Sequence, residues 1–412
     1  MAQELISNKT IAIVGAGPAG CFCAKLLLDY GCEVTLFDKG SPLRTILPTG
    51  GGRCNLAHSE FDFKELAKNY PRGEKFLYSV FSKFSTENTL NFFDSIGVKT
   101  YTQDDNRIFP TSNSSKEVQE KILSSIKNAN IIKEDVQQIS KLDNCYKIKT
   151  DKSSYAFDIV VVSIGGHSKL DILSPLDLRI EPQTQALVAL KTKENFADIS
   201  GVSIKNVKVL GKDFKQLKKD DIIFTHKGIS GPLIYKISSI YARKEMPYKL
   251  TLQLIEPFNL QEELDKNPHK EIKNLVGNFV PKSFANCVLK SLEIPLETSC
   301  CKINGKIRDK ILNKLTNFEI NIVGKVPDSE VVTCGGISLK EIDSKTMEAK
   351  RCPNLYFCGE VLDIDGFCGG FNLQNCWSTA YIAAQGVRQC YHSAWLKQLS
   401  FRTCFGISNK TY

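Results

Sequence analysis

The chain has 412 residues, of which 42% are hydrophobic and 24% are charged, and its formal net charge is +9. This length exceeds what one simple core needs and allows two or three domains. No run of about 18 apolar residues is present, so we expect no membrane span. The lysines are interleaved with acids, as in residues 218–221 (KKDD), which favours a solvated surface over a nucleic-acid partner.

The fifteen cysteines form no Cys-x-x-Cys pair and no zinc-ligand spacing, so we expect neither a metal site nor a thioredoxin-type redox pair. The first apolar strand begins near residue 10, which leaves no room for a signal peptide before it. We therefore expect a cytoplasmic protein in which most cysteines are small buried apolar residues.

Residues 10–38 have the pattern of a strand, a glycine turn, a helix and a second strand that ends in an acid. Gly15 allows the tight turn, Gly17 lets a pyrophosphate approach the backbone, and Gly20 lets helix and strand pack closely. The helix directs its free N–H groups and positive dipole end at the phosphates. Asp38 is placed to accept hydrogen bonds from an adenosine ribose. The pattern predicts a dinucleotide site but does not by itself separate NAD from FAD.

The next segments alternate between predicted helices and strands. Residues 40–56 form a loop that contains the sequence TGGGRCN at 49–55. Helices are predicted at 61–95 and 115–127, and strands at 131–139, 146–150, 154–157 and 158–166. The strand at 158–166 is almost continuously apolar and ends in two glycines, which is typical of the middle of a parallel sheet covered on both faces.

From about residue 182 the pattern changes to short alternating strands, at 186–191, 203–210 and 248–254, with helices at 270–276 and 308–315. Apolar strands return at 331–336 and 354–360, followed by a glycine loop at 366–370 and a helix at 372–390. We therefore predict an α/β fold with a discontinuous first domain, an inserted domain that is β-rich and then helical, and a C-terminal tail. Their predicted ranges are 1–185 with 332–395, 186–331, and 396–412.

Four features favour FAD as the dinucleotide. Val136 lies in a strand where flavoproteins of this layout contact adenine, and the glycines at 165–166 let the chain pass close to a cofactor. Only one complete Gly-x-Gly-x-x-Gly occurs, whereas a separate NAD domain would carry a second. The strand that ends at Gly359 and Glu360 leads into a helix whose N-terminus, near residues 370–372, is placed to stabilise negative charge on a reduced flavin.

Four longer motifs resemble those of the BaiN/RdsA-like family of NAD(P)/FAD-dependent oxidoreductases, also described as aminoacetone-oxidase-like flavoproteins. The motifs are TGGGRCN at 49–55, FTHKGISGP at 224–232, CGGISLKEID at 334–343 and YFCGEVLDIDGFCGGFN at 356–372. The resemblance extends over residues 10–388. It implies a glutathione-reductase-type FAD-binding Rossmann domain with an inserted β-barrel and helical domain.

The resemblance also implies which residues line the cofactor. The glycine turn and Asp38 hold the ADP half, the loop at 51–55 lines the flavin side, and Glu360, Asp363 and residues 369–373 close over the ribityl chain and ring. Together with the sequence pattern, this predicts the following cofactor-binding residues: Gly15, Ala16, Gly17, Pro18, Ala19, Gly20, Asp38, Lys39, Gly51, Gly52, Arg53, Cys54, Asn55, Val136, Gly165, Gly359, Glu360, Asp363, Gly370, Asn372 and Leu373. No catalytic residue is assigned.

The chain departs from the family pattern at three places. The segment after Gly166 is shorter than usual and begins with His167. Residues 43–45 read Leu-Arg-Thr where the family often has an Arg-Lys pair. Asn375 stands where the family commonly has a tryptophan, while Trp377 is kept. These differences bear on cofactor shielding and substrate access.

We predict a FAD-dependent oxidoreductase that acts on a small molecule, with flavin N5 as the hydride or electron carrier and NAD(P)H as a candidate reductant. Two alternatives stay open, namely a flavin-dependent RNA-modifying enzyme and a flavin-binding protein without turnover. Cys54 has a redox and a packing interpretation, and His226 an acid–base and a loop-ordering one. The sequence predicts no oligomeric state and names no substrate.

Overall fold

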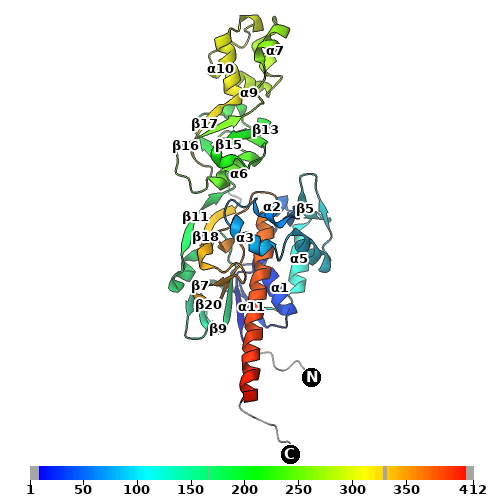
Figure 1. Ribbon diagram of the computed structural model, residues 1–412, viewed down its shortest axis with the longest axis vertical. Coiled ribbons are helices and arrows are strands. Elements are labelled where there is room, and N and C mark those ends of the chain that lie inside the picture. The colour runs from blue at the N-terminus through cyan, green and yellow to red at the C-terminus, as the bar shows by residue number, and fades with distance from the viewer. Residues whose placement is uncertain (1–8, 167, 328–331, 405–412) are drawn as a thin grey trace, which may run out of the picture. The chain divides into compact units, whose positions relative to one another are not determined.

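A computed structural model describes residues 9–166, 168–327 and 332–404, the last fourteen of these by their backbone only. Predicted features at other positions, His167 among them, lie outside the described residues. The chain divides into two compact units (Figure 1). The first comprises the residues up to Gln183 and those from Thr333, and the second comprises Thr184–Val332. The strands β11 (Ile180–Ala186) and β18 (Val332–Ile337) pair where the chain passes between the units.

The first unit is built on a six-stranded sheet with the order β19-β20-β10-β1-β2-β6. Its strands pair in parallel except β19 with β20. All four residues of β1 and of β10 are buried, which explains their continuous apolar sequence, because a central parallel strand is covered on both faces. The bounds are β1 (Ile11–Val14), β2 (Val34–Phe37), β6 (Asn130–Ile132), β10 (Ile159–Val162), β19 (Glu348–Ala349) and β20 (Cys352–Phe357).

Helix α1 (Pro18–Asp29) packs along α11 (Phe371–Cys404), so the first and last helices of the chain lie side by side (Figure 1). Phe22 of α1 contacts Trp377 of α11 with ring centroids 5.7 Å apart. Helix α11 continues beyond the predicted end at residue 390. Residues 396–404, predicted as part of a tail, are therefore helical.

Two predicted elements are wrong in detail, because a local pattern does not reveal where a chain changes direction. The predicted strand at 131–139 is two strands, β6 and β7 (Val136–Lys141), which belong to different sheets. The predicted helix at 61–95 is three helices, α2 (Phe63–Ala67), α3 (Glu74–Phe81) and α4 (Thr86–Ser95). The helix expected at 115–127 is α5 (Ser115–Ser125).

Two three-stranded antiparallel sheets complete the first unit, with the orders β3-β5-β4 and β7-β8-β9. Their bounds are β3 (Ala57–His58), β4 (Thr100–Thr102), β5 (Arg107–Pro110), β8 (Tyr146–Thr150) and β9 (Ser154–Phe157). Short 3-10 helices occur at Arg44–Ile46, Thr49–Gly51, Leu170–Leu176, Leu339–Glu341 and Gly359–Val361 in this unit, and at Ala197–Ile199, Lys212–Phe214 and Cys300–Lys302 in the other.

The second unit contains a closed barrel with the order β12-β15-β14-β13-β16-β17. The strands are β12 (Leu190–Thr192), β13 (Ser203–Leu210), β14 (Asp220–Thr225), β15 (Gly228–Ser230), β16 (Tyr248–Gln253) and β17 (Phe318–Lys325). The helices are α6 (Pro232–Ile240), α7 (Leu260–Lys266), α8 (Ile272–Val276), α9 (Lys282–Ser291) and α10 (Gly305–Thr316). Phe224 of β14 stacks on Phe284 of α9 at 5.1 Å, so barrel and helices share one core.

Among the described residues, no helix is both long enough and apolar enough to cross a bilayer.

Candidate functional site

The glycine turn between β1 and α1 assigns a different role to each of its glycines. A Cβ on Gly15 would lie 2.5 Å from the carbonyl oxygen of Ser163, and one on Gly20 would lie 1.9 Å from that of Gly15. These two positions are therefore filled by backbone. At Gly17 the nearest atom to an added Cβ is Oγ1 of Thr45, 3.9 Å away. The turn is closely packed at both ends and open in the middle, beside the start of α1.

Asp38 at the end of β2 is tied to the turn. Its Oδ2 accepts from the N–H of Ala16 at 2.8 Å, and its Oδ1 accepts from the N–H of Gly40 at 2.7 Å. A carboxylate has about four lone-pair positions, so these two bonds leave capacity for the ribose hydroxyls that the sequence predicts. Asp38 thus orders the loop that follows β2. The adjacent Lys39 is exposed.

The loop at 49–55 is held in a conformation that requires glycine. Gly50, Gly51 and Gly52 all have positive φ, at 58°, 68° and 85°. A Cβ on Gly51 would meet no atom within 4 Å, so this part of the loop faces open space. The guanidinium of Arg53 stacks over the ring of Phe109, 4.0 Å from its centroid, and its Nε donates to the carbonyl of Gly50.

Cys54 is completely buried within this loop. Burial raises the pKa of its thiol from an ordinary value near 9 to about 12. The thiolate is the redox-active form of cysteine, so at neutral pH the geometry supports the packing interpretation of Cys54 over the redox one.

Asn55 connects this loop to the C-terminal glycine loop. In the amide orientation that satisfies its neighbours, its Oδ1 accepts from the N–H of Gly370 at 2.9 Å and its Nδ2 donates to the carbonyl of Ala57 at 3.0 Å. Gly370 lies against the same segment, because a Cβ there would lie 2.3 Å from the carbonyl oxygen of Ala57. The structure therefore brings together two predicted segments that are more than three hundred residues apart.

The segment from Gly359 to Leu373 approaches the start of α1 from the other end of the chain. A Cβ on Gly359 would lie 2.8 Å from the Cβ of Ala19, and the N–H of Gly359 donates to Oγ1 of Thr379. The side chain of Asn372 closes the glycine loop, since it both accepts from the N–H and donates to the carbonyl of Gly366, at 2.8 and 2.9 Å. Glu360, Asp363 and Leu373 are half-buried.

Gly165 and Val136 have different surroundings. Gly165 has a φ of 80°, and a Cβ there would meet no atom within 4 Å. Val136 is the first residue of β7, which belongs to a separate sheet, and it pairs with Thr150. Gly165 thus resembles Gly17 and Gly51 in facing open space.

Sequence reasoning missed several residues that support these loops. Ser163 donates its Oγ proton toward the carbonyls of Val14 and Gly15. Tyr70 donates to the carbonyl of Phe371 at 2.6 Å, and Arg72 forms an ion pair with the fully buried Asp365. His58 stacks on Phe371, with 4.6 Å between centroids. Most of these contacts join residues about 300 positions apart, so no local signal reveals them.

His226 occupies the tip of the β14–β15 hairpin and is exposed. The rest of its motif has packing roles. A Cβ on Gly228 would lie 2.2 Å from the carbonyl oxygen of Leu190, and one on Gly231 would lie 2.9 Å from that of Asp221. Pro232 begins α6.

Comparison with known families decides what this arrangement is. A family model described as HI0933-like protein Rossmann domain matches residues 9–386. The chain belongs to this family. As a member of the HI0933-like family it is a FAD-binding oxidoreductase, as the sequence predicted.

Two characterised relatives match along nearly the whole chain. Ribosomal RNA dihydrouridine synthase of Escherichia coli (strain K12) is 26% identical over 395 residues, which covers 90% of this chain and 96% of that protein. The 3-dehydro-bile acid delta(4,6)-reductase of Clostridium scindens is 25% identical over 413 residues, covering 92% and 99%. Among solved structures, the open conformation of a flavocytochrome c3 fumarate reductase aligns with a TM-score of 0.46 and 13% identity, covering 93% of this chain and 78% of that one.

The residues present fit FAD. At Gly17, Gly51, Gly52 and Gly165 an added Cβ meets nothing closer than 3.9 Å, whereas Gly15 and Gly20, beside Gly17, are filled by backbone. Space is therefore left at Gly17, where α1 begins and where backbone N–H groups and the helix dipole favour a pyrophosphate.

Proposed function

We propose that this protein is a FAD-dependent reductase that adds a hydride and a proton across a carbon–carbon double bond conjugated to a carbonyl group, with NAD(P)H as the reductant and a small molecule as the substrate. The observation that carries the proposal is the open space at Gly17, where α1 begins, in a chain of the HI0933-like family. The names of both relatives support the chemistry, because dihydrouridine is uridine with its carbonyl-conjugated double bond reduced, and the second name specifies a reductase of 4,6 double bonds in a 3-oxo compound.

We propose that the predicted cofactor-binding residues act in three ways. Backbone at Gly17, Gly51 and Gly165 would lie against the cofactor, since nothing of the chain fills the space there. The side chains of Asp38 and Asn55 would order the surrounding loops through their hydrogen bonds to backbone.

The third role is electrostatic. Bound FAD supplies hydride transfer at its N5 position. The first N–H groups of α11, from Phe371 onward, have no acceptor within their helix, and they would stabilise negative charge on the reduced ring. The guanidinium of Arg53 carries a positive charge in the glycine loop and would act in the same direction.

A visible spectrum of the purified protein, repeated under anaerobic conditions after NADH, after NADPH and then after a conjugated ketone, tests the proposal. We expect a flavin spectrum that one nicotinamide bleaches and the ketone restores, with the saturated ketone as product. Protein that stays colourless after FAD is added would overturn the proposal, as would reduced flavin that no conjugated substrate reoxidises. A bound flavin that neither nicotinamide reduces would favour a binding protein without turnover.

A second candidate is reduction of uridine within RNA. The observation that favours it is a row of lysines on α10 that lacks acidic partners among the described residues, considered next. Uridine-containing RNA in place of the ketone as the anaerobic oxidant separates the two candidates.

A further inference from the structure

Helix α10 carries three lysines on one face. Lys306, Lys310 and Lys314 follow at a spacing of four residues, so their side chains leave the same side of the helix at steps of about 6 Å. The adjacent face is apolar, with Ile311 and Leu315 buried in the core of the second unit. Like charges four residues apart destabilise a helix, so a row of this kind is stabilised by an anion that binds along it.

The described part of the chain supplies no such anion. On α7 and α8 the lysines are ion-paired, Lys266 with Glu263 at 3.0 Å and Lys273 with Glu271 at 3.2 Å. None of the three α10 lysines has a carboxylate within ion-pair distance among the described residues. The acid on α10, Asp309, is paired with Arg308.

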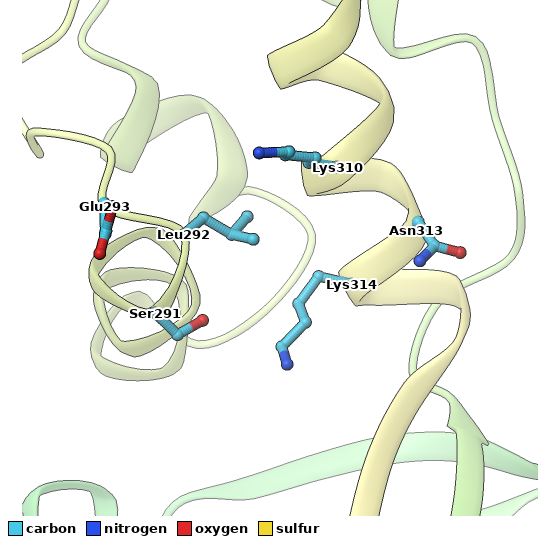
Figure 2. A pocket seen from close by; sticks show the side chains of 6 residues that line it. All are labelled: Ser291, Leu292, Glu293, Lys310, Asn313 and Lys314. Atoms are coloured by element: carbon cyan, nitrogen blue, oxygen red, sulfur yellow. The ribbon is translucent and has the colours of Figure 1, made fainter.

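The lysine row borders a hollow of about 320 Å³ between α10 and the end of α9. Its lining residues are Ser291, Leu292, Glu293, Lys310, Asn313 and Lys314. Figure 2 shows Lys310 and Lys314 extending from α10 toward Ser291 and Leu292. A second hollow of about 160 Å³ shares Lys310 and Leu292, so the concave surface continues along the helix.

A fourth lysine adds to the charge of this surface. Lys290 is exposed in the last turn of α9 and likewise has no ion pair among the described residues. Burial and then the carboxylate of Asp198 raise the pKa of the Cys287 thiol on the same helix, whereas Lys290 and Lys314 lower it. Lys310 and Lys314 thus line a hollow with one carboxylate, that of Glu293, and Lys306 and Lys290 lie on the same two helices.

The character of the surface favours a nucleic acid over a membrane. The large hydrophobic side chains that are exposed in the described chain are Phe61, Ile131, Leu142, Ile180, Ile223 and Val323, and none lies on α7–α10. A membrane-surface helix needs such an apolar wedge. Ser291 and Asn313 instead add polar groups that suit phosphate and sugar oxygens.

We propose that Lys306, Lys310 and Lys314 of α10, with Lys290 of α9, bind the phosphate backbone of a single-stranded segment of RNA. The proposal deepens the second candidate function, reduction of uridine within RNA, and rests on it only for the substrate, since the binding surface is argued from its own residues. The contacts are to phosphates, so binding depends steeply on salt and little on base sequence.

The test uses the full-length protein and a fluorescein-labelled single-stranded oligouridylate, with binding followed by anisotropy at several salt concentrations. The triple variant Lys306→Gln, Lys310→Gln, Lys314→Gln should bind at least about tenfold more weakly, and the slope of log affinity against log salt should fall by about 2, the loss expected for three phosphate contacts to a single strand. Replacing the same three lysines by arginine should restore both quantities.

A matched control removes the same charge elsewhere. The variant Lys141→Gln, Lys147→Gln, Lys149→Gln changes three exposed lysines in the β7–β9 sheet of the first unit, and it should keep wild-type RNA binding. Equal losses in both variants would overturn the proposal, because net charge alone would then explain binding. Wild-type protein that binds anionic phospholipid vesicles but not the oligonucleotide would also overturn it.

The two proposals fail in different ways. RNA that binds through α10 without reoxidising reduced flavin leaves the surface standing and counts against uridine as the substrate class. Reduction of a free conjugated ketone by protein that binds no RNA removes the surface and leaves the reductase.

Discussion

Two sets of glycines in the first unit differ in what surrounds them. Gly15 and Gly20 are in contact with backbone, so that an added Cβ would overlap a carbonyl oxygen. Gly17 and Gly51 face open space. The first set serves the fold, whereas the second is free of packing duties and leaves room for a ligand. A glycine motif therefore combines a packing requirement with a ligand-binding requirement, and the two can be tested separately.

The barrel provides a reference for this difference. Gly228 and Gly231, in the motif at 224–232, resemble Gly15 and Gly20, because backbone fills the position of a Cβ at both. The glycines of this motif therefore serve the packing of the barrel. The following predictions test the difference between packed and open positions, beginning with the largest expected effect.

Gly20→Ala should cost about 3 kcal/mol or more of the free energy of unfolding, because the new Cβ would lie 1.9 Å from the carbonyl oxygen of Gly15 and the helix would have to move. Urea unfolding measures the change. The control is Gly305→Ala, at the start of α10, where the nearest atom to an added Cβ is 3.8 Å away and stability should hold or rise slightly. A Gly20→Ala protein as stable as the wild type would contradict the packed assignment.

Gly17→Ala should leave stability within about 1 kcal/mol, since the backbone there, with φ of −78°, accepts any residue and space surrounds the position. FAD affinity should fall at least about tenfold, because the methyl group occupies the approach of the pyrophosphate. Flavin retained through dialysis, followed by its absorbance, measures the affinity. Wild-type retention of FAD would remove Gly17 from the cofactor site.

Asn375→Leu should stabilise the protein by about 1 to 2 kcal/mol. Asn375 is fully buried, and neither polar atom of its amide has a hydrogen-bond partner among the residues that the structure describes. A side chain of similar volume without polar atoms therefore removes a desolvation cost. Thermal unfolding checks this. Asn372→Leu, the control, removes an amide that is bonded to Gly366 and should destabilise.

Between pH 8 and pH 10, Cys54 gives the smallest effect. Its pKa is raised in the folded protein to about 12, against an ordinary value near 9, so above pH 9 the unfolded chain loses this proton while the folded one keeps it. Stability therefore falls as pH rises from 9 toward 12, by up to about 1.4 kcal/mol per pH unit from this one thiol.

Cys54→Ala should remove the contribution of this thiol to the pH dependence of stability. The free energy of unfolding at pH 8 and at pH 10, in wild type and variant, measures it. The flavin spectrum should show no thiolate charge-transfer band at neutral pH, and such a band, lost in Cys54→Ala, would reverse the assignment.

The local sequence predicted those elements that have a regular apolar pattern and are bounded by glycines or charged residues. The strand, glycine turn, helix and acid at 10–38 were predicted in order, as were the hairpin at 146–157 and the buried strand at 159–162, because each has its pattern within a few residues. The prediction failed at residues 131–139, where the chain passes from one sheet to another through Lys133, Glu134 and Asp135.

The sequence by itself determined that this protein carries one dinucleotide turn and to which family, and thus to which cofactor, it corresponds. Only the tertiary structure decided which glycines are packed and which are open, because that depends on atoms such as the carbonyl of Ser163, remote in the chain. It also decided the contacts of Asn55 with Gly370 and of Arg72 with Asp365. Hydrogen bonds and close packing act over a few ångströms in space, and distance along the chain does not encode them.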